Sequence, residues 1–61
     1  LGGRFQKAGI PKDFIIVKLN NVYIENVEKF EGLIRQFNPG DGVLIQGFNP
    51  DGEADYFAFE W

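Results

Sequence analysis

The stretch NVEKFEGLIRQF, residues 26–37, carries the clearest periodicity in the chain. Its apolar residues are spaced by three, four and three positions, as on one face of an α-helix: Val27, Phe30, Ile34 and Phe37. Asn26 precedes this face as a candidate N-cap, and Glu28 lies in the first turn, where the helix dipole favours an anion. Pro39 and Gly40 follow as stop signals. The pattern predicts a helix over residues 26–37.

The segments on either side of this helix have the composition of β-strands. Upstream, the β-branched run DFIIVKL (13–19) predicts a buried strand, and the pair Asn20–Asn21 predicts a tight turn into a short strand over 22–24. Downstream, GVLIQGF (42–48) and ADYFAFEW (54–61) predict two strands joined by NPDGE. The chain should therefore end in a hairpin.

The core is expected between the long helix and this last strand. Phe57, Phe59 and Trp61 alternate with Ala58 and Glu60, so one face of the strand should be aromatic and buried. We expect the apolar face of the helix to pack against that face. It should also contact the strand that contains Ile15–Val17.

The N-terminal residues LGGRFQKAGI (1–10) allow two interpretations. The glycines could form a loop whose backbone N–H groups hold a carboxylate or phosphate. They could equally form a turn into a short helix that Gly9 and Pro11 bring to an end. With either interpretation, the elements amount to one small α+β domain over residues 1–61.

Composition excludes several classes of function. The net charge of −3, with six scattered basic residues, provides no cationic stripe for nucleic acid. Cysteine is absent, so disulfides and thiolate metal sites are excluded. Serine, threonine and histidine are absent too, which removes the usual nucleophiles and the imidazole base. We therefore expect no enzyme activity from this chain by itself, no cofactor and no metal. No apolar run reaches the roughly 20 residues of a membrane helix, and no signal segment is visible.

The acidic residues suggest a calcium loop that fails in detail. Asp51, Glu53 and Asp55 alternate as in such a loop, but Tyr56 stands where glycine is needed. A hairpin turn over residues 49–52 explains the same residues. Two carboxylate pairs are expected to be solvated surface charge rather than an acid–base site: Glu28 with Glu31, and Asp51 with Asp55.

Three residues of the long helix lie to one side of its apolar face: Lys29, Leu33 and Gln36. On pattern alone, Leu33 belongs to the edge of the core and the other two are exposed. The alternative, that they line a binding groove, comes from a family resemblance.

Four segments, taken in order, resemble the PDZ domain of bacterial trypsin-like serine proteases of the protease Do (HtrA) type: KAGI, DFIIVKLNN, NVEKFEGLIRQFNPGDGVLIQGF and DGEADYFAF. The ending is most similar to the last PDZ domain of such a protease. The resemblance begins at about Lys7 and implies a PDZ-like partial barrel of short strands with one short and one long helix. Asn21 stands where the family usually has glycine, a change that asparagine tolerates.

The resemblance also decides between the two interpretations of the N-terminal glycines. In PDZ domains a full strand and its hairpin partner separate the carboxylate loop from the short helix, whereas here QKAGI follows Phe5 directly. LGGRF therefore matches the turn into the helix. The chain is then expected to be an N-terminally truncated fragment of a larger protein, lacking the carboxylate-loop strand.

The resemblance implies a peptide-interaction module of a periplasmic serine endopeptidase, which recognises or positions unfolded polypeptide or C-terminal peptide tails beside a sibling protease domain. Lys29, Leu33 and Gln36 would form the helical wall of its groove. The alternative is an assembly segment that packs against other domains or subunits and binds no peptide. Since the missing strand would leave a sheet edge unpaired, we also expect the isolated chain to self-associate through that edge or to be marginally folded.

Overall fold

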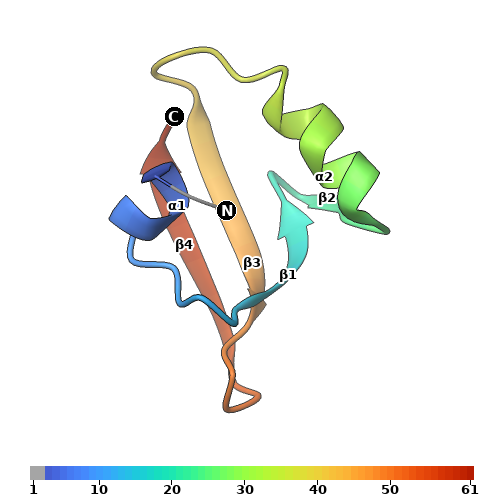
Figure 1. Ribbon diagram of the computed structural model, residues 1–61, viewed down its shortest axis with the longest axis vertical. Helices are drawn as coiled ribbons and strands as arrows, with labels where there is room; N and C mark the ends of the chain where they lie inside the picture. The colour runs from blue at the N-terminus through green and yellow to red at the C-terminus, as the bar shows by residue number, and fades with distance from the viewer. Residues whose placement is uncertain (1–2) are drawn as a thin grey trace.

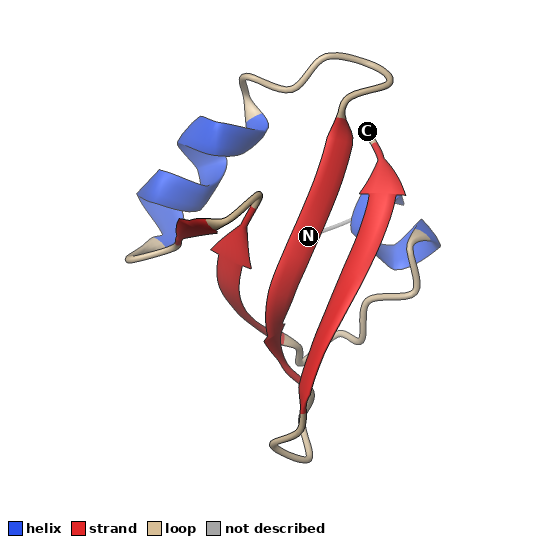
Figure 2. Cartoon of the chain, turned by 180° about the vertical axis from the view of Figure 1, so that it is seen from behind, coloured by secondary structure: helices blue, strands red, loops and turns tan. Residues whose placement is uncertain are grey.

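The computed structural model describes residues 3–61 and has the predicted α+β order (Figure 1). Its elements are α1 (Gly3–Lys7), β1 (Ile15–Leu19), β2 (Val22–Tyr23), α2 (Val27–Ile34), β3 (Gly42–Phe48) and β4 (Ala54–Glu60). The strands form an open antiparallel sheet in the order β2-β1-β3-β4. Seen from behind, α1 lies across the sheet near β4, and α2 lies beside the β2 end (Figure 2).

The turn between β1 and β2 forms as predicted. Asn20 and Asn21 have φ angles of 49° and 66°, the pair of positive values that a two-residue type I′ hairpin turn requires. The Asn20 side chain also ties the turn to β3, because its Oδ1 accepts the Leu44 N–H at 2.7 Å and its Nδ2 donates to the Gly42 carbonyl at 3.2 Å. This turn therefore orients the short hairpin against the centre of the sheet.

The side chains of strand β3 alternate between the two faces of the sheet. Val43, Ile45 and Gly47 are buried on the inner face, whereas Phe48 on the outer face is exposed. A Cβ atom at Gly47 would collide with the Ile15 carbonyl, so this position requires glycine. The register between β1 and β3 shifts at the same place, as in a β-bulge.

The core lies between the inner face and the two helices. Its buried residues are Phe5, Leu19, Phe30, Val43 and Ile45. Phe5 of α1 is the centre of an aromatic cluster, with ring centroids 5.7 Å from Phe30, 5.9 Å from Phe59 and 5.9 Å from Trp61. The inner side of β4 is thus aromatic as predicted, but Phe59 and Trp61 are only partly buried.

The long helix is shorter than predicted. It ends at Ile34, and the next turns are tight, because Gln36 and Phe37 donate their N–H groups to carbonyls three residues back. Pro39 explains this ending, since its ring would clash with the carbonyl of Arg35 if the helix continued. Phe37 nevertheless packs on Trp61, with centroids 5.1 Å apart.

Parts of the predicted core are also corrected. Val27 lies on the apolar face of α2 but is 66% exposed, because this end of the helix extends beside the two-residue strand β2 instead of over the wide part of the sheet. Ile15 is 60% exposed on the outer face, so α2 does not pack on it. Phe57 packs edge-to-face with Phe14 at 5.2 Å, and the aromatic partner of α2 is Phe5.

At the N-terminus, α1 begins at Gly3, so the predicted turn is described only from that residue, and Leu1 and Gly2 lie outside the described residues. Gly9, with φ 85°, ends the helical segment as predicted, and the Ile10 N–H donates to the Phe5 carbonyl at 3.2 Å. In the described part of the chain, no helix is both long and apolar enough to cross a membrane.

Candidate functional site

The residues of the predicted helical wall lie on one side of α2. Lys29 and Leu33 are one turn apart, and Gln36 lies two residues beyond Ile34, the last helical residue. Lys29 and Gln36 are exposed, whereas Leu33 is partly buried against the core. At about 100° per residue, Lys29 and Leu33 point roughly opposite to Glu31 on the helix. Lys29 and Leu33 thus lie on one side of α2, and Glu31 lies on the opposite side.

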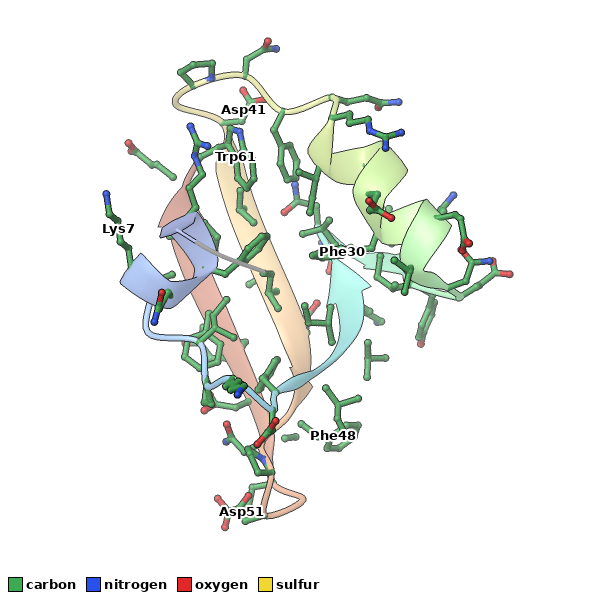
Figure 3. The ribbon with its side chains drawn as sticks, viewed as in Figure 1. Lys7, Phe30, Asp41, Phe48, Asp51 and Trp61 are labelled. Atoms are coloured by element: carbon green, nitrogen blue, oxygen red, sulfur yellow. The ribbon has the colours of Figure 1, made fainter. Side chains whose placement is uncertain are left out.

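The side of α2 that carries Glu31 faces a cleft between the two helices. This helix cleft, of about 420 Å³, is bounded by Arg4 and Phe5 of α1, by Phe30, Ile34 and neighbouring residues of α2, and by Trp61. Figure 3 shows Trp61 beside Asp41 at the end of β4, and the Trp61 N–H donates to the Asp41 carbonyl at 2.8 Å. Phe30 lies on the side of α2 that faces the core.

A second cleft, of about 390 Å³, lies at the N-terminal end of the same helix. This strand cleft is mostly apolar, with Phe14, Ile16, Ile24, Val27 and Phe30 in its walls. Phe30 belongs to both clefts. We call these two clefts together the α2 groove.

Asn26 holds the N-terminal end of this groove in place. Its backbone is extended, and its side-chain Oδ1 accepts the Lys29 N–H at 2.8 Å, which is the N-cap geometry predicted from the sequence. The cap fixes where α2 begins and therefore where Val27 emerges beside the strand cleft. The exposed apolar residue at that position is a consequence of local structure and of the short neighbouring strand.

The charges in the helix cleft come from both helices. Arg4 stacks its guanidinium over the Trp61 ring at 4.5 Å, while Glu31 of α2 and Arg35 at its C-terminal end also line the cleft. A cation over the indole face is attracted by the ring quadrupole. Polar groups therefore border the cleft, and its floor is made by the rings of Phe5 and Phe30.

The carboxylates of the β3–β4 hairpin have structural partners. Asp51 Oδ1 accepts the Glu53 N–H at 2.9 Å. Asp55 accepts from the Asn49 amide at 3.1 Å and from the Tyr56 N–H at 2.7 Å, and these two hydrogen bonds lower the pKa of Asp55 below its usual 3.8. Asp51 and Asp55 thus stabilise the turn. Over residues 3–61 no cluster of three or more acidic, histidine or cysteine side chains is arranged to hold a metal ion.

Several residues of the α2 groove have no counterpart in the sequence prediction. Arg4 and Phe5 belong to the N-terminal glycine stretch, and Trp61 was predicted on the aromatic face of the last strand but not in a cleft beside Arg4. Local periodicity cannot bring such distant positions together. The aromatic character of Phe5 and Trp61 was the signal that could have found them, since large aromatic side chains in a small domain must share its one core.

The chain matches no known family model, no curated protein and no solved structure. The function proposed below therefore rests on the residues and geometry of the molecule, together with the resemblance of its sequence motifs.

Proposed function

We propose that this chain is a protein-interaction module that binds an extended, apolar polypeptide segment in the α2 groove. The observation that carries the proposal is the meeting of two apolar clefts at Phe30, along the side of α2 on which Val27 is exposed. Removing apolar surface from water is favourable, and a ligand covers more of that surface when it is concave.

The dimensions of the groove suit a short extended segment. The eight residues of α2 span about 12 Å at 1.5 Å per residue, which is the length of about four extended residues. Affinity would come from apolar side chains in the helix and strand clefts. A segment of this size is expected to bind at micromolar level, equivalent to about −8 kcal/mol.

The biological setting belongs to the same proposal. The order of motifs resembles PDZ domains of the protease Do type, so the module would belong to a periplasmic serine protease and help it to recognise or position unfolded polypeptide. The four-stranded open sheet with two helices is compatible with such a partial barrel. The genomic sequence upstream of Leu1 tests this setting: a serine-protease domain in the same reading frame supports it, and an unrelated upstream region contradicts it.

The alternative is an assembly segment in which another part of the parent protein covers the α2 groove. The exposure of Val27 favours this alternative as well, because a sibling domain would also bury it. The two functions differ in whether a free peptide binds to the isolated chain.

Binding is measured by titrating the chain with a short apolar peptide and following the fluorescence of Trp61, which lies in the helix cleft. Val27→Asp places a carboxylate in the strand cleft, and we expect it to weaken binding about tenfold or more. Gln36→Asp is the matched control, since it adds the same charge at an exposed position on the wall predicted from the sequence.

Each outcome separates the possibilities. Loss of binding in Val27→Asp alone supports the α2 groove. Loss in Gln36→Asp alone assigns binding to the wall of Lys29, Leu33 and Gln36 instead. If the unaltered chain binds no peptide while circular dichroism shows it folded, the assembly function is favoured.

A further inference from the structure

The outer face of the sheet, opposite to both helices, is a second apolar surface. Its largest exposed side chains are Tyr56 at 66%, Tyr23 at 63%, Ile15 at 60% and Phe48 at 43%. They come from all four strands, and a shallow hollow of about 380 Å³ lies between Tyr23 and Tyr56. Neither tyrosine belongs to the α2 groove, so this surface is separate from the proposed peptide site.

The strand register arranges the outer face in two cross-strand rows. In the first row Tyr23 pairs with Lys18, Lys18 with Gln46, and Gln46 with Tyr56. Residues paired across antiparallel strands point to the same face, so these four side chains form a line across the sheet. In the second row Ile15 pairs with Phe48.

This line has the symmetry of a two-fold interface. Consider two copies stacked outer face to outer face, with a two-fold axis between the sheets that runs parallel to the strands, midway between β1 and β3. This axis places β2 of one copy over β4 of the other, and β1 of one copy over β3 of the other. It places Tyr23 on Tyr56 of the second copy and Lys18 on Gln46 of the second copy. In the second row the same axis places Ile15 on Phe48 of the second copy. We propose that two copies of this chain pack outer face to outer face about this axis.

The polar centre of the face supports this pairing. Gln46 Oε1 is enclosed and accepts no hydrogen bond from residues 3–61, whereas Lys18 holds its ammonium group over the Tyr23 ring at 4.6 Å. An acceptor without a donor is destabilising, and the terminal torsion of glutamine is soft. Rotation of the Gln46 amide turns Oε1 outward, where Lys18 of the second copy donates to it. The two-fold axis forms this hydrogen bond twice.

The area of the face suits such an interface. An aromatic side chain has about 150–250 Å² to bury, so the exposed parts of Tyr23, Tyr56 and Phe48 amount to on the order of 400 Å², and Ile15 brings the total to on the order of 500 Å². With the partly buried Lys18, the patch reaches on the order of 600 Å² per partner, which is the lower end of the range for specific interfaces. Sheets that pack face to face in this way keep their strands within about 30° of each other.

The test is sedimentation equilibrium of the chain over a range of concentrations. It compares the unaltered chain with a variant that carries an added lysine and with a double variant in which the lysine and the glutamine change places. In Gln46→Lys, the introduced ammonium group lies opposite Lys18 of the second copy as well as beside Lys18 of its own copy. We expect the dissociation constant of the dimer to rise about tenfold or more, while circular dichroism shows the variant folded. The double exchange Lys18→Gln with Gln46→Lys restores a lysine opposite a glutamine, so it should return the constant to about that of the unaltered chain. Lys12→Gln, at an exposed loop position, is the charge control and should leave dimerisation unchanged.

Three results would overturn the proposal. One is a chain that stays monomeric over the whole concentration range. Another is a Gln46→Lys variant that dimerises like the unaltered chain, which would place the interface elsewhere, for example at a sheet edge. The third is a double exchange that stays monomeric although circular dichroism shows it folded. Peptide binding through Trp61 is measured separately, so its failure does not affect these results.

Discussion

Truncation of Phe30 to alanine should remove most of the stability of this domain. Phe30 is 7% exposed, and its ring lies 5.7 Å from that of Phe5, the centre of the aromatic cluster. A phenylalanine buries about 150–250 Å², and truncation to alanine in a core costs about 3–5 kcal/mol once the cavity is included. At about 0.05–0.15 kcal/mol per residue, a chain of this length has only about 3–9 kcal/mol of stability. The loss is therefore comparable to the whole.

The assay is urea unfolding followed by Trp61 fluorescence, with far-ultraviolet circular dichroism as a second probe. The matched control is Phe48→Ala, measured at low protein concentration, because Phe48 carries the same ring on the exposed outer face. We expect the control to cost less than about 1 kcal/mol. Equal unfolding midpoints for the two variants would refute the conclusion that the core is centred on the Phe5–Phe30 contact.

Three further predictions concern the turn, the hairpin and the sheet edge. Asn20→Ala removes two hydrogen bonds to β3 and should lower the unfolding free energy by about 1–2 kcal/mol, with Asn20→Asp, which keeps the acceptor, losing less in the same urea assay. The Asn49 amide and the Tyr56 N–H lower the pKa of Asp55 in the folded chain, so its contribution to stability is present above about pH 3.8 and is lost as the pH falls through the lowered pKa. Asp55→Asn should flatten this acid limb in unfolding curves measured against pH, and an unchanged limb would contradict the assignment. Finally, the backbone N–H of Ala58 points away from β3, so Ala58→Pro should leave the fold intact and abolish any association through the β4 edge, as measured by sedimentation.

The α2 groove was only partly predictable. The sequence placed an apolar face on the long helix and three candidate residues on its flank, but the choice of flank depended on the resemblance. In the structure, the clefts lie on the side of Val27 and Ile34, because α1 and the β1–β2 hairpin border that side. The sequence of residues 26–37 does not reveal where α1 packs. The same holds for the row of paired residues on the outer face, which exists only once the strand register is known.

Short stretches of sequence were enough to predict the features that depend on neighbouring residues. The N-cap at Asn26, the positive φ angles at Asn20 and Asn21, and the two strands of the last hairpin all follow from side chains that act within a few positions. Hydrogen bonds and backbone preferences of this kind are local, so they can be recognised without knowledge of the fold.

Packing of the whole chain, by contrast, selected the apolar residues that became core. Val27 and Phe30 belong to the same apolar face of the helix, yet Phe30 is buried against Phe5 and Val27 is exposed. Burial requires a partner from elsewhere in the chain, and Phe30 has one. Phe37 likewise lies beyond the end of the helix and packs on Trp61. The hydrophobic effect rewards apolar area removed from water without specifying a partner, so the pairing of distant residues is settled only when all the elements come together.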